Sequence, residues 1–272
     1  MTAVIEQPGL AAEEVTVRFG GVVALDHCTL SAPVGRITGL IGPNGAGKST
    51  LFNACSGLVP TTTGSVSLFG EPVDRLGPSA RARRGMSRTF QKMELFSTMT
   101  VAQNVEMGRE ASWAGINVLR SVYRSRSGRR ECEEARDGAL ALCGLEPLRD
   151  RLVRSLSTGQ RRMVEFARVL ANPARLLLLD EPSSGLDRNE TAEFARVLQM
   201  AVETRGCGVL LVEHDMSLIT AVCDRVHVLD FGKKICEGTV DEVLSDHLVR
   251  AAYLGVVDEE LDRVAEEAGS GL

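Results

Sequence analysis

The sequence lacks the marks of a membrane-spanning or a secreted protein. No run approaches the roughly 18 apolar residues of a spanning helix, and the start, MTAVIEQPGLAAEE, has no basic region with an apolar core behind it. We therefore expect neither a membrane span nor a secretion signal. The 7 cysteines are odd in number and include no C-x-x-C pair. This argues against a disulfide framework and a zinc site, and it favours reduced cytosolic thiols.

An excess of positive charge is also absent, and there is no internal repeat. The formal net charge is −5, whereas general nucleic-acid binders usually display a basic balance that neutralises phosphates. We therefore expect no nucleic acid among the partners. What is present is a chain of 272 residues, 44% hydrophobic and 25% charged. This composition is typical of a globular protein with one large domain or two smaller ones.

Short apolar segments of two kinds predict a layered fold. Residues 15–19 and 65–69 alternate like half-buried strands, whereas 176–179 and 209–212 are continuous apolar runs. Alternation suits an antiparallel sheet with one wet face, and continuous runs suit buried parallel strands. The order of elements predicts an α/β architecture with a smaller antiparallel piece near the amino terminus. Helical patterns separate the buried runs and cover residues 161–171, 190–204 and 216–223.

The middle of the chain shows helices without convincing strands. Thr100 and Gln103 have the spacing of a capping box at a helix start, and residues 130–143 are rich in helix formers. We interpret this region as an inserted helical subdomain, and we expect an acidic, mobile tail at the end of the chain. The predicted segments are a core of residues 10–91 and 156–250, the helical subdomain at about 92–155, and the tail at 256–272.

The stretch GPNGAGKS, residues 42–49, matches G-x-x-x-x-G-K-[ST] in the context that its chemistry requires. An apolar run at 37–41 precedes it, and residues 48–55 have helix spacing. Glycines let backbone N–H groups turn inward around phosphate oxygens, and the helix dipole adds to the attraction. Lys48 would reach the β and γ phosphates, while the Ser49 hydroxyl would bind Mg²⁺. An ordinary glycine turn is the alternative.

Two carboxylates, Asp180 and Glu181, follow four leucines. They stand at the carboxyl end of a predicted buried strand, where ligands of parallel α/β sheets collect. In a P-loop protein the first carboxylate would orient the Mg²⁺ shell, and the second would polarise the water that attacks the γ-phosphate. The alternative is a strand that merely ends in an acidic helix cap.

Ser157 and Gln160 have capping-box spacing at the start of a helix that continues as RRMVEFARVL. One interpretation is a helix cap alone, and the other is a hydroxyl and N–H groups presented to a phosphate. The segment LSTGQ, residues 156–160, resembles the signature of ATP-binding-cassette (ABC) ATPases, usually written LSGGQ. Thr158 departs from that pattern and slightly restricts the loop, whereas Gly159 is retained at the more demanding position.

Other motifs follow in the order of that family. Gln91 resembles its Q-loop glutamine, residues 183–187 resemble its D-loop, and His214 resembles its switch histidine. Phe19 lies where the family places an aromatic residue, commonly Tyr, against adenine. Base stacking of this kind contributes about 1 to 3 kcal/mol per base. A core phenylalanine on an edge strand is the alternative for Phe19.

The resemblance covers essentially residues 10–250. It implies one ABC ATPase domain over 10–255, with an α/β P-loop NTPase (RecA-like) core, an N-terminal antiparallel β subdomain and an inserted helical subdomain. It also implies that two cassettes associate head to tail, so that each ATP lies between one subunit's P-loop and the other's signature.

The resemblance assigns roles to individual residues. Glu181 would act as general base, and His214 would contact the γ-phosphate, with a satisfied structural histidine as the alternative. The implied cofactors are ATP and Mg²⁺. The implied catalytic residues are Glu181, His214 and Gln91, and the implied metal ligands are Ser49, Gln91 and Asp180. The implied ATP-binding residues are Phe19, Gly42, Asn44, Gly45, Gly47, Lys48, Ser49, Thr50, Ser157, Gly159, Gln160 and Asp187.

Segments outside the catalytic motifs resemble the ATPases of branched-chain amino acid uptake systems. Related importers of urea, amides or other amino acids share parts of them, as does a lipopolysaccharide-exporter ATPase. Asp187 departs from this group, many of whose members have Asn there. The similar segments are residues 88–91, 94–96, 99–105, 212–216, 228–232 and 252–255, together with the long stretch after Gly108.

The implied partners are two transmembrane permease subunits, a second cassette of similar but distinct type and, indirectly, an extracytoplasmic solute-binding protein. The implied place is the cytoplasmic face of the cell membrane. Lys92, Met93, Leu95 and Phe96 are candidates for contact with a short permease helix, although core packing is an alternative for Leu95 and Phe96. A soluble cassette acting on DNA or ribosomes and a slow nucleotide-sensing module are hypotheses from other classes.

Overall fold

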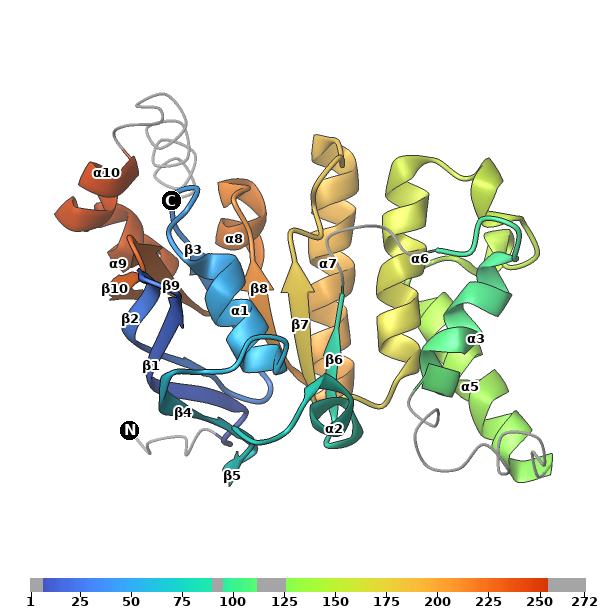
Figure 1. Cartoon of the computed structure of the whole chain (residues 1–272). Helices are drawn as coiled ribbons and strands as arrows, with labels where there is room; N and C mark the ends of the chain where they lie inside the picture. The colour runs from blue at the N-terminus through green and yellow to red at the C-terminus, as the bar shows by residue number, and fades with distance from the viewer. Residues whose placement is uncertain (1–6, 90–94, 112–125, 254–272) are drawn as a thin grey trace, which may run out of the picture. The chain divides into compact units, whose positions relative to one another are not determined.

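The computed structural model describes residues 7–89, 95–111 and 126–253. The chain divides into two compact units, and the colour bar of Figure 1 locates their residue ranges along the chain. The first unit contains Met1–Pro78 and Gly208–Leu272, and the second contains Ser79–Cys207. Both combine strands with helices, so the predicted α/β class is confirmed.

The first unit contains an antiparallel sheet in the order β2-β1-β4-β5. Residues 65–68 of β4 alternate in burial as predicted, because one face of the sheet covers apolar side chains and the other meets solvent. The alternation predicted over 15–19 in β1 is wrong, since Val15, Thr16 and Val17 are all buried where the pairing with β2 shifts register. This sheet confirms the predicted antiparallel piece near the amino terminus. Its strands are β1 (Leu10–Phe19), β2 (Val22–Ala32), β4 (Thr63–Leu68) and β5 (Glu71–Pro72).

The first unit also contains parallel strands. β3 (Ile37–Ile41) lies between β8 (Gly208–Val212) and β9 (Arg225–Asp230), and it is parallel to both. Every residue of β3 and β8 is buried, which explains their continuous apolar sequences. Leu40 is paired with Val212, so the chain segments that follow these two strands leave the sheet at the same edge.

Four helices and one more strand complete the described part of the first unit. β10 is antiparallel to β9 and joins it through the tight turn at Phe231 and Gly232. These elements are α1 (Lys48–Ser56), α8 (Met216–Val222), α9 (Val240–Ser245), α10 (His247–Tyr253) and β10 (Lys233–Gly238).

In the second unit, β6 (Met86–Arg88) is parallel to β7 (Leu176–Asp180). Among the helices, α3, α5 and α6 pack against one another, and the rings of Phe166 and Phe194 have centroids 5.0 Å apart. The helices are α2 (Pro78–Arg83, which starts at the boundary between the units), α3 (Val101–Ala111), α5 (Arg126–Leu142), α6 (Thr158–Ala171) and α7 (Arg188–Arg205), with short 3-10 helices at Glu146–Leu148 and Val153–Ser155.

The region predicted to be helical contains only helices and turns in its described part, apart from one isolated bridge between Thr100 and Leu152. The predicted capping box of α3 is confirmed. The N–H of Gln103 donates to Thr100 Oγ1 at 3.2 Å, and the N–H of Thr100 donates to Gln103 Oε1 at 2.9 Å. The limits of this subdomain stay a prediction, and the tail at 256–272 lies outside the described residues.

The helices and the cysteines of the structure bear on the expectations about membrane spans and disulfides. Across the described ranges, none of the helices combines the length and apolar character needed to cross a bilayer. The cysteines of the chain are all free thiols, and burial raises the pKa of Cys143 to about 12.

Candidate functional site

The glycine-rich loop follows β3 and leads directly into α1, as predicted. Gly42, Gly45 and Gly47 have φ angles of 148°, 82° and 100°, which favour glycine. A Cβ on Gly42 would lie 2.1 Å from the carbonyl oxygen of Leu229, and one on Gly47 would lie 2.9 Å from that of Ala24. The loop therefore needs glycine at these two positions for its shape and for its close approach to neighbouring backbone.

The start of α1 is arranged to receive an anion. Gly47 is the N-cap, and it supplies no side-chain hydrogen bond to the first turn. The Lys48 ammonium donates to the carbonyl oxygens of Gly42 at 2.6 Å and of Pro43 at 3.0 Å, which hold it at the loop. Asn44, Gly45 and Ser49 are exposed around it, while Thr50 is half-buried. Backbone N–H groups, a helix dipole and a lysine together suit a phosphate group.

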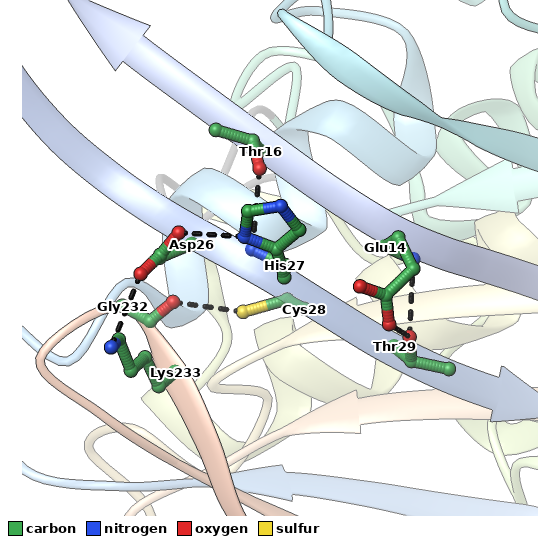
Figure 2. Close-up of polar contacts among 8 residues, drawn as sticks. All are labelled: Glu14, Thr16, Asp26, His27, Cys28, Thr29, Gly232 and Lys233. Atoms are coloured by element: carbon green, nitrogen blue, oxygen red, sulfur yellow. Dashed lines mark hydrogen bonds and ion pairs between the residues drawn. The ribbon is translucent and has the colours of Figure 1, made fainter.

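The antiparallel sheet supports this loop through one residue, Gly232, at the β9–β10 turn. The N–H of Gly232 donates to the carbonyl oxygen of Ala46 at 3.0 Å, and the N–H of Asp26 donates to the Gly232 carbonyl oxygen at 2.8 Å. Figure 2 shows the same carbonyl accepting from the Cys28 thiol at 2.9 Å, and Lys233 paired with Asp26 at 3.2 Å. β2 and the β9–β10 turn thus fix the position of the loop.

Phe19 lies at the end of β1 and is 53% exposed. The alternative that it is a core residue is therefore wrong. Phe96, in the second unit, is 46% exposed, so core packing is wrong for Phe96 as well, while Leu95 is half-buried. Both phenylalanines expose aromatic surface to solvent, which a single side chain can do without a functional reason.

His214 comes two residues after the end of β8, and its side chain is 63% exposed. The residue between them, Glu213, is buried. Glu213 Oε2 accepts from the backbone N–H of His214 at 3.1 Å and lies 3.8 Å from His214 Nδ1. A buried carboxylate thus fixes the backbone from which the exposed imidazole projects. Glu213 was not among the predicted residues, although an acid directly after a buried apolar run was the same signal that identified Asp180.

In the second unit, Asp180 is the last residue of β7 and is 3% exposed. Its N–H donates to Thr89 Oγ1 at 3.1 Å, and its Oδ2 lies 3.8 Å from Arg88 Nη2. Burial lowers the pKa of the Arg88 guanidinium, and the charge of Asp180 opposes this shift. The Asp180 carboxylate, held at a strand end beside the Arg88 guanidinium, is suited to binding a metal cation, either in addition to the guanidinium or in its place.

Glu181 follows in a left-handed backbone conformation, with φ of 47°. This conformation is uncommon for a residue other than glycine and costs about 1–3 kcal/mol. The alternative that the carboxylate pair caps a helix is wrong, because α7 begins at Arg188 and has Asp187 as its cap. Backbone strain directly after Asp180 is the kind of feature that clusters at active sites.

The predicted capping box at the start of α6 is confirmed. The N–H of Gln160 donates to Ser157 Oγ at 3.2 Å, and the N–H of Ser157 donates to Gln160 Oε1 at 3.1 Å. Gly159 lies against Glu190, since a Cβ on Gly159 would be 2.1 Å from Glu190 Oε1. The second unit thus brings the signature segment and the start of α7 together.

Asp187 and Glu190 form a second capping box, at the start of α7. Asp187 Oδ1 accepts from the N–H of Glu190 at 2.9 Å, and Glu190 Oε2 accepts from the N–H of Asp187 at 3.2 Å.

The predicted residues that the structure describes fall into two groups, one in each unit. The first unit holds Phe19, the glycine-rich loop and His214, and the second holds Asp180, Glu181, the signature segment and Asp187.

Three predicted residues, Gln91, Lys92 and Met93, lie outside the described residues. Within the described ranges, the structure contains no group of three or more His, Cys, Asp and Glu side chains that could hold a metal ion. A metal site built by protein side chains alone is therefore not found in that part of the chain. A site completed by oxygen atoms of a bound phosphate needs only one or two protein ligands.

Comparisons with known proteins identify relatives along most of the chain. A family model described as "ABC transporter" matches residues 25–184, and one described as "Branched-chain amino acid ATP-binding cassette transporter" matches residues 233–259. The chain is 33% identical over 254 residues to the high-affinity branched-chain amino acid transport ATP-binding protein BraF of Pseudomonas aeruginosa, with 92% of this chain and 99% of BraF covered.

Two further proteins are informative. The lipopolysaccharide export system ATP-binding protein LptB of Escherichia coli is 32% identical over 246 residues, with 90% of this chain and 97% of LptB covered. The crystal structure of the ADP conformation of MJ1267, an ATP-binding cassette of an ABC transporter, has a TM-score of 0.80 and 29% identity, and covers 91% of this chain and 99% of that one. The chain therefore belongs to the ABC transporter family, as one of its ATP-binding subunits with ATPase activity.

Proposed function

We propose that this chain powers the import of branched-chain amino acids, as one of two cassettes bound to a permease at the cytoplasmic face of the membrane. The observation that carries the substrate class is the match of residues 233–259 to the branched-chain amino acid cassette family. Identity alone would not decide, because BraF and LptB are almost equally similar to this chain. The match lies outside the P-loop, signature and carboxylate motifs, so it reflects more than shared ATP chemistry.

The first unit fits the triphosphate and base of ATP. The shape of the glycine loop directs N–H groups at the start of α1 toward an anion, and Lys48 adds a positive charge. We assign the phosphates to Gly42, Asn44, Gly45, Gly47, Lys48, Ser49 and Thr50. Phe19 has the exposed ring that an adenine platform requires.

The donor set also fits Mg²⁺. Mg²⁺ in nucleotide sites takes one or two protein oxygens and completes its shell with phosphate oxygens and water. Ser49 offers an exposed hydroxyl in the first unit, and Asp180 offers a buried carboxylate in the second. With Gln91, these residues are our proposed ligands. When bound, Mg²⁺ would neutralise charge on the phosphate oxygens.

The chain's own residues would then carry the proton and orient the reacting groups. We propose that the Glu181 carboxylate accepts a proton from the attacking water as general base. Its strained φ of 47° sets the carboxylate at a direction that a relaxed strand end would not give. His214 would donate a hydrogen bond to the γ-phosphate, and the buried Glu213 would hold the backbone of His214 in place. Gln91 would sense the bound nucleotide.

We propose that the second half of each ATP site comes from another cassette of similar but distinct type. Ser157, Gly159 and Gln160 begin α6, whose first turn can receive a phosphate, and Asp187 begins α7. Each cassette would contact the nucleotide of the other, so that ATP closes the pair and hydrolysis loosens it. Lys92, Met93, Leu95 and Phe96 would receive a helix of one of two permease subunits, and a solute-binding protein outside the cell would deliver the substrate.

One reconstitution tests this proposal. The chain is co-purified with the partners encoded for the same transporter, placed in vesicles, and assayed for phosphate release with the solute-binding protein loaded with leucine, urea or no solute. We expect leucine to stimulate hydrolysis, because the closed cassette pair favours one permease orientation. Stimulation by urea alone, or recovery of the chain with a lipopolysaccharide-exporting permease, would contradict the substrate class.

The catalytic assignment has its own test. Glu181→Gln should retain ATP binding and lose about 10² to 10⁴-fold in turnover, which is the usual contribution of a general base. Glu203→Gln, on the exposed surface of α7, is the matched control. Turnover by Glu181→Gln at the parental rate would show that another group takes the proton.

A further inference from the structure

The second unit joins two segments of the candidate site that are well separated in the sequence. One is the start of α6 at Thr158, and the other is the loop 183–187 between β7 and α7, which we refer to as the D-loop. A Cβ on Gly185 would lie 3.5 Å from Thr158 Cγ2, an ordinary packing distance. Gly159 in turn lies against the carboxylate of Glu190. The start of α6 therefore lies close to the D-loop and against the first turn of the helix that follows it.

A buried ion pair on α6 makes a third contact at the middle of the D-loop. Arg162 Nη1 donates to Glu165 Oε2 at 3.0 Å, and the two side chains are 8% and 5% exposed. Arg162 Nε also donates to the backbone carbonyl oxygen of Ser184, at 3.3 Å. The guanidinium thus spans from its own helix to the D-loop, and a hydrogen bond from a charged donor is stronger than one between neutral groups.

The surroundings of the Arg162 guanidinium leave little room for solvent beside the ion pair. Arg162 and Glu165 line a cavity of about 10 Å³ together with Phe166, Pro182 and Phe194. That volume holds no more than one water molecule. Ser184 itself is exposed, so if the guanidinium is removed its carbonyl oxygen can turn to solvent and the D-loop loses this contact with α6. The pair therefore restrains the D-loop from inside the unit.

Arg162 has no counterpart in the roles assigned so far, since it touches neither the nucleotide-binding loop nor the proposed catalytic groups. We propose that Arg162 is a positioning residue of the ATPase cycle. Held by Glu165, it fixes the D-loop to the signature helix, so that the two surfaces offered to a second cassette move as one body. The inference rests on the proposed function of Ser157 and Asp187 at a cassette pair, while the restraint itself is a property of this single chain.

The test must separate positioning from folding, because Arg162→Met alone would leave a buried carboxylate and destabilise the unit. The double variant R162M/E165L replaces both charges by apolar groups, which is often neutral or stabilising. The control is R196M/E193L on α7. That pair has the same residue types at the same i,i+3 spacing, but its side chains are 58% and 51% exposed.

Two readouts are measured on each variant, hydrogen exchange on the full chain alone and ATP turnover on the chain assembled with its partner cassette. Hydrogen exchange of the peptide covering residues 183–187 reports the D-loop restraint, and steady-state kinetics report kcat and KM for ATP. For R162M/E165L we expect a parental melting temperature, exchange about ten- to a hundredfold faster and a kcat lower by about tenfold. KM stays parental, because Lys48 and Phe19 are untouched. R196M/E193L should match the parent throughout.

Parental exchange in R162M/E165L would overturn the proposal, whatever the kinetics show. Fast exchange with parental kcat and KM would also overturn it, since the restraint would then have no part in turnover. A parent complex, assembled with its partner cassette, that does not hydrolyse ATP would refute the proposed function instead. In that case accelerated exchange confined to R162M/E165L still supports the restraint as a structural property of the unit.

Discussion

The first unit holds its candidate residues by backbone geometry, whereas the second holds them by side-chain contacts. Around the glycine loop, Gly42 and Gly47 approach carbonyl oxygens too closely for any Cβ. In the second unit, Gly159 meets only the end of the Glu190 side chain, and Arg162 reaches the D-loop through its guanidinium. A site fixed by backbone tolerates few substitutions, while a site fixed by side chains can adjust and can be tuned.

Helix starts differ between the two regions in the same way. α1 begins at Gly47 with no side-chain cap, whereas α6 and α7 begin with complete capping boxes. At α1 the first N–H groups of the helix are left for a phosphate. At α6 the Ser157 oxygen already accepts from Gln160, but its hydroxyl hydrogen can still be donated. A phosphate at α1 would therefore meet free backbone N–H groups, whereas a phosphate at α6 would also meet the Ser157 hydroxyl.

The largest expected effect tests the backbone side of this comparison. Gly42→Ala places a Cβ 2.1 Å from the Leu229 carbonyl oxygen and forces alanine to a φ of 148°. Overpacking and left-handed strain each cost about 1–3 kcal/mol, so the free energy of unfolding should fall by about 2–6 kcal/mol in a denaturant titration. Gly159→Ala should change it by less than about 1 kcal/mol, because the Glu190 carboxylate can move aside. Equal losses of unfolding free energy in Gly42→Ala and Gly159→Ala would contradict the distinction between a site fixed by backbone and a site fixed by side chains.

Much of this comparison could be predicted from the sequence, because local spacing determines it. The capping boxes at Thr100 and Ser157, the glycine loop, and the buried strands at 176–179 and 209–212 all depend on residues close together in the chain. Local patterns of this kind express hydrogen-bonding and burial requirements that act before the chain folds on itself.

Other features needed the fold. The left-handed conformation of Glu181 has no sequence signal, since the preceding leucines predict only a strand. The Arg162–Ser184 contact joins residues on opposite sides of β7 in the sequence, and nothing in the spacing of charges distinguishes Arg162 from the exposed Arg196. Glu213 does have a sequence signal, because it directly follows the buried apolar run 209–212. Contacts between distant segments depend on packing that a single sequence does not reveal.

A second prediction concerns the exposed ring in the first unit. Phe19→Ala should weaken ATP binding by about 1–3 kcal/mol, or about 5- to 150-fold in Kd. Its stability should stay within about 0.5 kcal/mol of the parent, since the side chain is 53% exposed. Phe96→Ala, which removes a similarly exposed ring from the second unit, is the control and should bind ATP as the parent does. Titration calorimetry measures both, and equal Kd values would refute the stacking role.

A third prediction uses pH to probe the first unit alone. His227 is buried on β9, with Nε2 3.2 Å from the Ser31 carbonyl oxygen and Nδ1 3.4 Å from Glu237 Oε2. Burial lowers its pKa from the usual 6.5, although Glu237 opposes this shift and the charges of Lys234 and Arg225 add to it. The unfolded chain therefore binds a proton before the folded chain does. Stability should fall as pH drops below about 6.5, by up to about 1.4 kcal/mol per pH unit.

His227→Gln removes this titration and is the comparison for the pH series. Its unfolding free energy should fall less steeply between pH 6.5 and 5 than that of the parent, as measured by urea titrations at each pH. Apart from Glu237, which pairs with His227, the acidic groups of the chain contribute equally to both proteins. Parallel slopes would show that the imidazole is not held neutral by burial.

A smaller loss of stability than that of Gly42→Ala accompanies the test that decides between the two interpretations of Ser157. As an N-cap its hydroxyl oxygen accepts from Gln160, and Ser157→Ala should cost about 1 kcal/mol of unfolding free energy. Thr239→Ala removes the corresponding contact from the capping box of α9 and should cost a similar amount. If Ser157 also donates to a phosphate across a cassette pair, turnover falls only in Ser157→Ala. Equal turnover in the two variants would leave Ser157 with the helix cap as its whole role, and the second unit would then offer the nucleotide only backbone N–H groups and the side chains of Gln160 and Asp187.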